Sequence, residues 1–114
     1  MFHLFEPDSP SEPDTLSIYL SGGPGCSSLG TGMMFEHGPV TVPLHPAGME
    51  SNTDKDEPLI PNPYGWTEAT NMLYIEQPAG TGFSYGPWPR NENEVSRDVY
   101  GFMVNFFETF PHFL

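Results

Sequence analysis

Basic residues are scarce in this 114-residue chain, which has 3 lysines and arginines against 15 aspartates and glutamates. The formal net charge at pH 7 is therefore −12. Lys55, Arg90 and Arg97 are far apart in the sequence and form no basic patch. Because nucleic-acid binding relies on clustered cations that displace counterions from phosphates, the composition argues against a nucleic-acid partner.

Cysteine and long hydrophobic runs are also lacking. Cys26 is the single cysteine, which excludes an internal disulfide and a cysteine-rich metal site in these residues. No apolar run approaches the ~20 residues that a membrane helix needs, so we expect no membrane partner. The segment Met1–Pro7 has no charged start followed by a long apolar stretch, and we therefore expect no signal peptide in this chain.

Glycine and proline, by contrast, are abundant, with 12 and 14 copies. They indicate many turns, and we expect exposed loops over residues 7–14 and 38–65. Two short apolar segments, residues 15–20 and 71–76, are typical of strands. Residues 33–35 are expected to form at most a helical turn. The length suits one domain, spanning residues 1–114.

The clearest predicted element is a helix near the end of the chain. Its apolar residues recur at spacings of three and four, as on one face of a helix. They are Val95, Val99, Phe102, Met103, Phe106, Phe107 and Phe110. Asn91 and Glu94 approximate a capping box at its start, and Pro111 ends it. Two strands and one amphipathic helix predict an α/β fold.

Residues 21–32 hold five glycines and one proline, and we expect a loop over this range; its glycine-rich first part, Ser21–Ser28, follows the first predicted strand. Glycines permit positive φ angles and allow backbone N–H groups to approach an anion or an oxyanion. A tight turn without a ligand is the alternative from the glycines alone. The loop carries neither the Gly-Lys-Ser/Thr nor the GxGxxG pattern of nucleotide-binding loops.

Residues 82–86 match the G-x-S-x-G pattern of a nucleophile elbow, which requires a strand running directly into the serine and a helix leaving it. Pro78 and Gly80 separate Ser84 from the preceding strand, and Pro87 follows, so a structural loop is the better interpretation. The four histidines lack the spacing of metal ligands, and we expect them to be packed or exposed. They are His3, His37, His45 and His112.

Several motifs in one order resemble the serine carboxypeptidases, a branch of the α/β-hydrolases. Residues 22–28 (GGPGCSS) resemble the signature loop of that family, and residues 36–39 (EHGP) resemble its Glu-x-Gly-Pro. Residues 62–66 (NPYGW) and 71–85 (NMLYIEQPAGTGFSY) follow in the family's order. The resemblance covers most of the chain and implies a partial α/β-hydrolase fold with the activity of a serine-type carboxypeptidase.

The resemblance also implies roles for individual residues. The Gly23 N–H would be an oxyanion-hole donor, and Ser21, Gly22 and Glu36 would bind the terminal carboxylate of a peptide substrate. Thr31 and Phe35 would line the pocket of the departing residue. Cys26 would form a disulfide with a distant cysteine of the full-length protein. No cofactor and no metal are implied, and the family's location is secreted or vacuolar.

Three departures from the family pattern leave alternatives open. Ser21 stands where the family usually has asparagine, and Gly30 is an extra residue that could shift Glu36. The nucleophile elbow, aspartate and histidine of the triad are expected downstream of residue 114, so we expect none of the triad in this chain. The alternatives are a carboxypeptidase-like acyltransferase or lyase, and a truncated product without catalytic activity.

Overall fold

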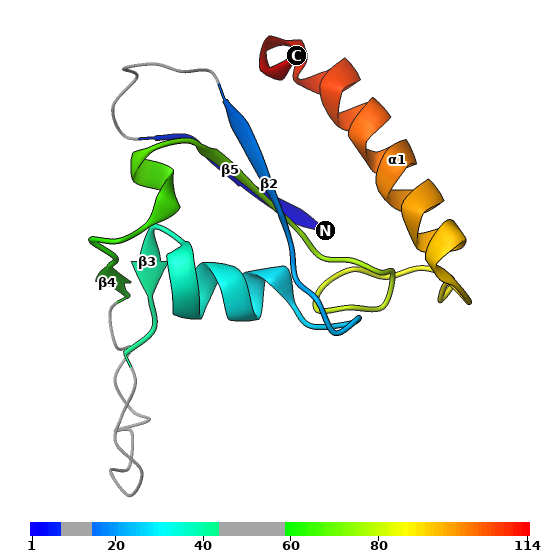
Figure 1. Ribbon diagram of the computed structural model, residues 1–114, viewed down its shortest axis with the longest axis horizontal. Helices are drawn as coiled ribbons and strands as arrows, with labels where there is room; N and C mark the ends of the chain where they lie inside the picture. Colours follow the sequence, from blue (N-terminus) through cyan, green and yellow to red (C-terminus); the bar gives the residue numbers. More distant parts are fainter. Residues whose placement is uncertain (8–14, 44–58) are drawn as a thin grey trace, which may run out of the picture.

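A three-stranded sheet forms the centre of the protein, whose computed structural model describes residues 1–7, 15–43 and 59–114 (Figure 1). The strand order is β1-β5-β2, from β1 (Phe2–Phe5), β2 (Leu16–Leu20) and β5 (Asn71–Ile75). β2 runs parallel to β5, whereas β1 is antiparallel to it. The predicted strands over 15–20 and 71–76 are therefore confirmed, and β1 was missed.

β5 is buried along its whole length. Met72 and Tyr74 point to one face of the sheet, because side chains alternate along a strand. There they pack with Leu29 and Met33 of the helix η1 (Ser28–His37). A strand that is covered on both faces reads as a continuous apolar run, which is why its sequence shows no polar alternation.

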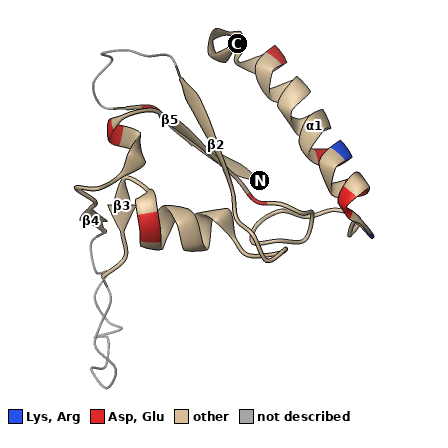
Figure 2. Ribbon diagram, in the orientation of Figure 1, with Lys and Arg blue, Asp and Glu red and all other residues tan. Residues whose placement is uncertain are grey.

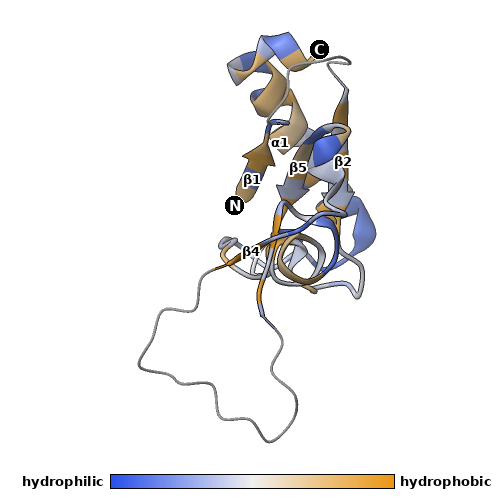
Figure 3. Cartoon of the chain, turned by 90° about the vertical axis from the view of Figure 1, so that its left-hand side faces the viewer, coloured by the Kyte–Doolittle hydropathy of each residue, from blue (hydrophilic) through white to orange (hydrophobic). Residues whose placement is uncertain are grey.

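The opposite face of the sheet is covered by the helix α1 (Glu92–Thr109). Leu73 and Ile75 pack there with Phe106, which is 3% exposed. The predicted apolar face of the helix is thus confirmed. Figure 1 shows the sheet between η1 and α1, and Figure 3 shows β1 mainly in the hydrophobic colour. The architecture has three layers and confirms the α/β class.

The predicted cap of α1 is confirmed in its main feature. The Asn91 side-chain oxygen accepts hydrogen bonds from the N–H groups of Asn93 and Glu94. The Glu94 carboxylate accepts from the N–H of Arg90 and, at 3.3 Å, from the Asn91 side-chain amide, rather than from the Asn91 backbone N–H as in a standard capping box. The helix ends before Pro111, and residues Pro111–Phe113 form the short helix η3.

One loop prediction was wrong. Residues 28–32 belong to η1, which is a π-helix of ten residues and not a helical turn over 33–35. Glycines 30 and 32 hid it from sequence reasoning, because glycine disfavours helices by about 1 kcal/mol. Gly32 is needed there, since a Cβ at this position would lie 2.3 Å from the Tyr19 ring.

The remaining elements are short. β3 (Val40–Thr41) pairs antiparallel with β4 (Ile60–Pro61), and the helix η2 (Trp66–Glu68) precedes β5. The two predicted loops, over 7–14 and 38–65, lie largely outside the described residues. No helix in the described part is long and apolar enough to cross a membrane. Figure 2 shows the acidic residues distributed over separate elements.

Candidate functional site

The carboxyl ends of β2 and β5 bring two loops together. Leu20 pairs with Ile75, so Ser21 and Glu76 leave the sheet at the same edge. The Gln77 side-chain amide donates a hydrogen bond to the Ser21 carbonyl oxygen at 3.3 Å. Ligands of α/β proteins commonly bind outside the carboxyl ends of parallel strands, which makes this edge the candidate site.

The glycine-rich loop has the backbone geometry that the sequence indicated. Gly23 and Gly25 have φ angles of +125° and +95°, and the Gly23–Pro24 peptide bond is cis. The Cys26 N–H closes the turn on the Gly22 carbonyl oxygen at 3.2 Å. Among the described residues, no protein group accepts a hydrogen bond from the Gly23 N–H.

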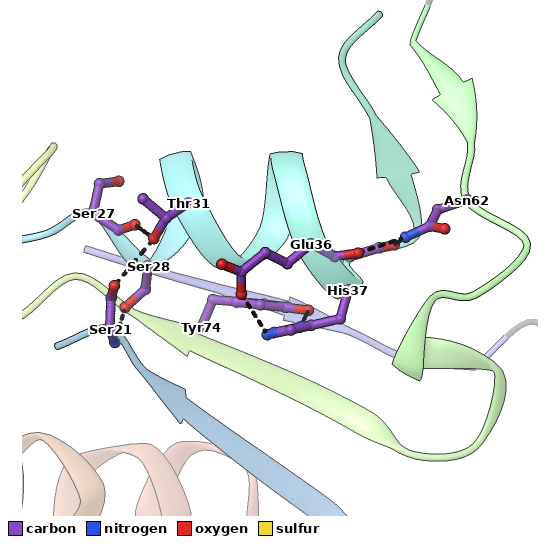
Figure 4. A network of polar contacts seen from close by, with 9 residues as sticks. Ser21, Ser27, Ser28, Thr31, Glu36, His37, Asn62 and Tyr74 are labelled. Atoms are coloured by element: carbon purple, nitrogen blue, oxygen red, sulfur yellow. Dashed lines mark hydrogen bonds and ion pairs between the residues drawn. The ribbon is translucent and has the colours of Figure 1, made fainter. Parts of the chain in front are cut away.

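Ser21 and Thr31, two predicted site residues, are hydrogen-bonded to each other at 3.0 Å (Figure 4). The Thr31 hydroxyl donates to the Ser27 carbonyl oxygen at 2.6 Å, so Ser21 must be the donor to Thr31. Ser21 is 6% exposed, and its N–H donates to the Ser28 hydroxyl at 2.9 Å. Its hydroxyl proton is therefore already engaged and would have to leave Thr31 to reach a substrate carboxylate.

Glu36 and Phe35 lie near the other end of η1 and are exposed. Figure 4 shows Ser21 beside the start of this helix and Glu36 further along it. The hydrogen bonds of a π-helix join residues five apart, so Thr31 and Glu36 are separated by about one turn. No described hydrogen bond links the Glu36 carboxylate to Ser21, Gly22 or Gly23.

A cleft of about 580 Å³ opens between the glycine-rich loop and the start of α1. It brings together Ser21, Gly22 and Gly23, whereas Thr31, Phe35 and Glu36 do not line it. The lining also includes Gln77, Pro78, Trp88, Pro89, Arg90, Asn91, Glu92 and Val95. Arg90 was missed as a site residue; its only sequence signal is that it is one of three cations in the chain.

The sequence predicted that His37 is either packed or exposed. The structure shows it packed in an aromatic cluster next to Glu36. Its Nδ1 lies 3.0 Å from the Tyr74 hydroxyl, and its ring stacks on Trp66 with centroids 4.2 Å apart. Burial lowers the pKa of His37, and the Glu36 carboxylate, 3.9 Å from Nε2, opposes this shift only in part. Burial, with a smaller contribution from Tyr19, raises the pKa of Tyr74 to about 12. The Tyr74 phenol therefore keeps its proton and can donate it to a neutral His37.

The lowered pKa of His37 predicts that acid destabilises the fold. In the unfolded chain the His37 imidazole takes up a proton near its ordinary pKa of 6.5, whereas in the folded protein it does so only at lower pH. Stability is therefore complete above pH 6.5 and falls as the pH drops through the folded-state pKa, by at most about 1.4 kcal/mol per pH unit. Urea unfolding between pH 7.5 and 5 should show this loss in the wild type and a shallower loss in His37→Phe. Equal slopes would exclude His37 as the cause.

Ser84 occupies a tight turn, in line with its interpretation as a structural residue. Its hydroxyl donates to the Glu76 carbonyl oxygen at 2.6 Å and accepts from the amino group of Met1 at 2.7 Å. No group of three or more potential metal ligands gathers in the described part of the chain. Cys26 is exposed and unpaired in this structure, and its disulfide to a distant cysteine remains a prediction.

Comparison with known proteins matches the profile of the serine carboxypeptidase family to residues 1–114. A vacuolar serine-type carboxypeptidase of Saccharomyces cerevisiae is 38% identical over 97% of this chain and 20% of its own length. The lysosomal protective protein of Mus musculus is 38% identical over 98% of the chain and 22% of its own length. P-(S)-hydroxymandelonitrile lyase of Sorghum bicolor is 37% identical over 99% of the chain and 21% of its own length.

The chain thus spans about a fifth of the length of the curated relatives that it matches. The matched region contains the glycine-rich loop, both parallel strands and α1. The chain belongs to the serine carboxypeptidase family.

Proposed function

We propose that residues 1–114 supply the oxyanion hole and the substrate-recognition loop of a serine-type carboxypeptidase. The observation that carries this proposal is the Gly23 N–H, which has no acceptor among the described residues and belongs to a residue lining a cleft at the carboxyl ends of parallel strands. Such a donor stabilises the negative charge that develops on a carbonyl oxygen during acyl transfer. The substrate would be the C-terminus of a peptide or protein.

The proposed reaction proceeds through an acyl-enzyme formed on a serine outside residues 1–114. That serine would attack the last peptide bond while Gly23 stabilises the oxyanion, and water would release the acyl group. Glu36, with Gly22 and Ser21, would recognise the terminal carboxylate. Because two carboxylates repel, this recognition requires a proton shared between them and favours acid pH. Thr31 and Phe35 would contact the departing residue.

The hydrogen bond of Ser21 supports a second reaction class. Its hydroxyl is bonded to Thr31, so recognition of a free carboxylate would need rearrangement or a bridging water. A similar protein, from sorghum, is named as a lyase, so the scaffold alone does not determine the reaction. A carboxypeptidase-like acyltransferase is the alternative in which an acceptor other than water takes the acyl group.

The test uses the full-length product of the gene and a pair of blocked dipeptides that differ only at the C-terminus. We expect release of the last amino acid from the free acid and at least tenfold slower cleavage of the amide, since the amide lacks the recognised charge. A serine-directed inhibitor should abolish release. Transfer of the acyl group to an added alcohol without hydrolysis would favour the acyltransferase. An intact mass near 12.7 kDa with no turnover would contradict the proposal.

The location follows from the same proposal. The yeast relative is named as vacuolar and the mouse relative as lysosomal. We infer a secreted or vacuolar site of action for the whole protein, where Cys26 could form its predicted disulfide.

A further inference from the structure

Glu76 is a buried carboxyl group that neither oxyanion stabilisation nor carboxylate recognition uses. It follows β5 directly and is 3% exposed. Its Oε1 accepts hydrogen bonds from the Ser27 hydroxyl at 2.6 Å and from the Leu29 N–H at 2.8 Å. The shorter distance is that of a close O–H···O hydrogen bond. Burial of a charged group is costly unless it is hydrogen-bonded, so a carboxyl at this position calls for an explanation.

The backbone N–H and carbonyl oxygen of Glu76 are also hydrogen-bonded. Its N–H donates to the Met1 carbonyl oxygen at 3.1 Å, and its carbonyl oxygen accepts from the Ser84 hydroxyl at 2.6 Å. The residue therefore connects the start of the chain, the start of η1 and the turn at residues 80–84. Its side-chain oxygens have little freedom to move relative to the sheet.

The absence of a side chain at Gly82 leaves room for the Glu76 carboxyl group. This glycine has a φ of +52°, and a Cβ on it would lie 1.6 Å from Oε2 of Glu76. Any side chain at position 82 would displace the carboxyl. Among the described residues Oε2 has no hydrogen-bond partner, so both bonds to the start of η1 depend on Oε1.

The residues that contact Glu76 lie at the end of the glycine-rich loop. Ser27, its hydroxyl partner, is the cap of η1 and accepts from the Gly30 N–H at 2.8 Å. At the other end of the loop, the Ser21 N–H is bonded to the Ser28 hydroxyl. Residues 22–26 lie between these two anchors and contain one described backbone bond, from Cys26 to Gly22. The orientation of the loop therefore depends on its anchors.

We propose that Glu76 is a positioning residue, which directs the Gly23 N–H by fixing the start of η1 through Ser27 and Leu29. The effect on catalysis rests on the proposed function, whereas the effect on the loop does not. Glu76 itself would touch neither substrate nor the reacting atoms.

The loop is tested by amide hydrogen exchange in the full-length gene product and its variants. In Glu76→Leu, the peptide covering residues 21–31 should exchange about tenfold faster, because the Ser27 hydroxyl and the buried Leu29 N–H lose their acceptor. Glu76→Gln keeps an acceptor oxygen for Ser27 and Leu29 and should exchange within about threefold of the wild type. The peptide covering 92–109 is the internal control and should not change. Unchanged exchange at 21–31 in Glu76→Leu would overturn the proposal.

Kinetics separate positioning from a merely structural role. In Glu76→Leu we expect kcat to fall about 100-fold, the usual cost of a lost oxyanion donor, with a smaller rise in KM because Ser21 and Gly22 of the same loop would bind the substrate carboxylate. A peptide aldehyde that forms a tetrahedral adduct should bind about 100-fold more weakly, whereas a product-like peptide should weaken by a much smaller factor. Glu76→Gln should restore kcat to within about tenfold. Equal losses in kcat for both variants would contradict the need for an acceptor.

If Glu76→Leu does not fold, Ser27→Ala replaces it, because that variant leaves the carboxyl in place and removes the hydroxyl that donates to it and that accepts from the Gly30 N–H. It should change exchange and kcat in the same direction by a smaller factor, and no change in either would overturn the proposal. A wild type that hydrolyses no peptide contradicts the proposed function, and the exchange result then decides the role of Glu76 in the loop. An active wild type with unchanged kcat in the variants contradicts only the inference on Glu76.

Discussion

Purified residues 1–114 are expected to release no amino acid from a blocked dipeptide above the rate in buffer. Nucleophilic catalysis requires a hydroxyl within hydrogen-bonding distance of a general base. The Ser84 hydroxyl has the Glu76 carbonyl oxygen and the amino group of Met1 as its partners, and no described histidine contacts it. His37 is buried against Tyr74 and cannot serve as that base. The measurement is amino-acid release at equal molar amounts of this polypeptide and of the full-length gene product.

The control for this experiment is Ser84→Ala in the same polypeptide. Turnover that a serine-directed inhibitor blocks and that Ser84→Ala abolishes would contradict our interpretation and make Ser84 the nucleophile. Turnover that persists in Ser84→Ala would point to a contaminating peptidase.

Gly23→Ala in the full-length gene product is expected to lower kcat by about 10²–10³, with a much smaller change in KM. An alanine is disfavoured at a φ of +125°, and its Cβ would lie 3.1 Å from the Cys26 sulfur and 3.2 Å from the Cys26 nitrogen. The backbone must therefore rotate, which turns the Gly23 N–H away from its present direction. Steady-state kinetics on the free-acid dipeptide measure the loss.

Gly101→Ala is the matched control for this substitution. Gly101 lies in α1 and has no positive φ, and a Cβ on it would meet no neighbouring segment within 4 Å. We expect unchanged kinetics and a helix stabilised by about 0.5–1 kcal/mol. A kcat within threefold of the wild type in Gly23→Ala would remove Gly23 from the oxyanion hole.

The sequence was most informative where the pattern was local. The stripe that includes Phe102 and Phe106, with Asn91 before it, predicts α1 because its apolar spacing and cap are contained in the helix itself. β1 was missed because four residues at a chain end carry almost no periodic signal; their strand exists through pairing with β5. η1 was underestimated because its glycines disfavour a helix, and because its start is hydrogen-bonded to Glu76, which is distant in sequence.

In the candidate site, too, features with a local sequence signal were predictable and features that depend on distant segments were not. The positive φ angles of Gly23 and Gly25 follow from glycine chemistry and were foreseeable. Neither the bond between Ser21 and Thr31 nor the position of Arg90 beside the cleft has a local signature, because both arise from the juxtaposition of separate segments. The roles of Glu36, Thr31 and Phe35 stay predictions that rest on the family resemblance.

The position of β5 at the centre of the sheet has a consequence for synthesis on the ribosome. Phe2 pairs with Ile75 and Leu16 pairs with Asn71, so β1 and β2 are made long before the strand that joins them. Closing such long loops is entropically costly and slows folding. Among the described strands, β5 is the only sheet partner of β1 and of β2, so this sheet cannot form until β5 has left the exit tunnel. Strand edges that stay unpaired during translation favour aggregation of the nascent chain.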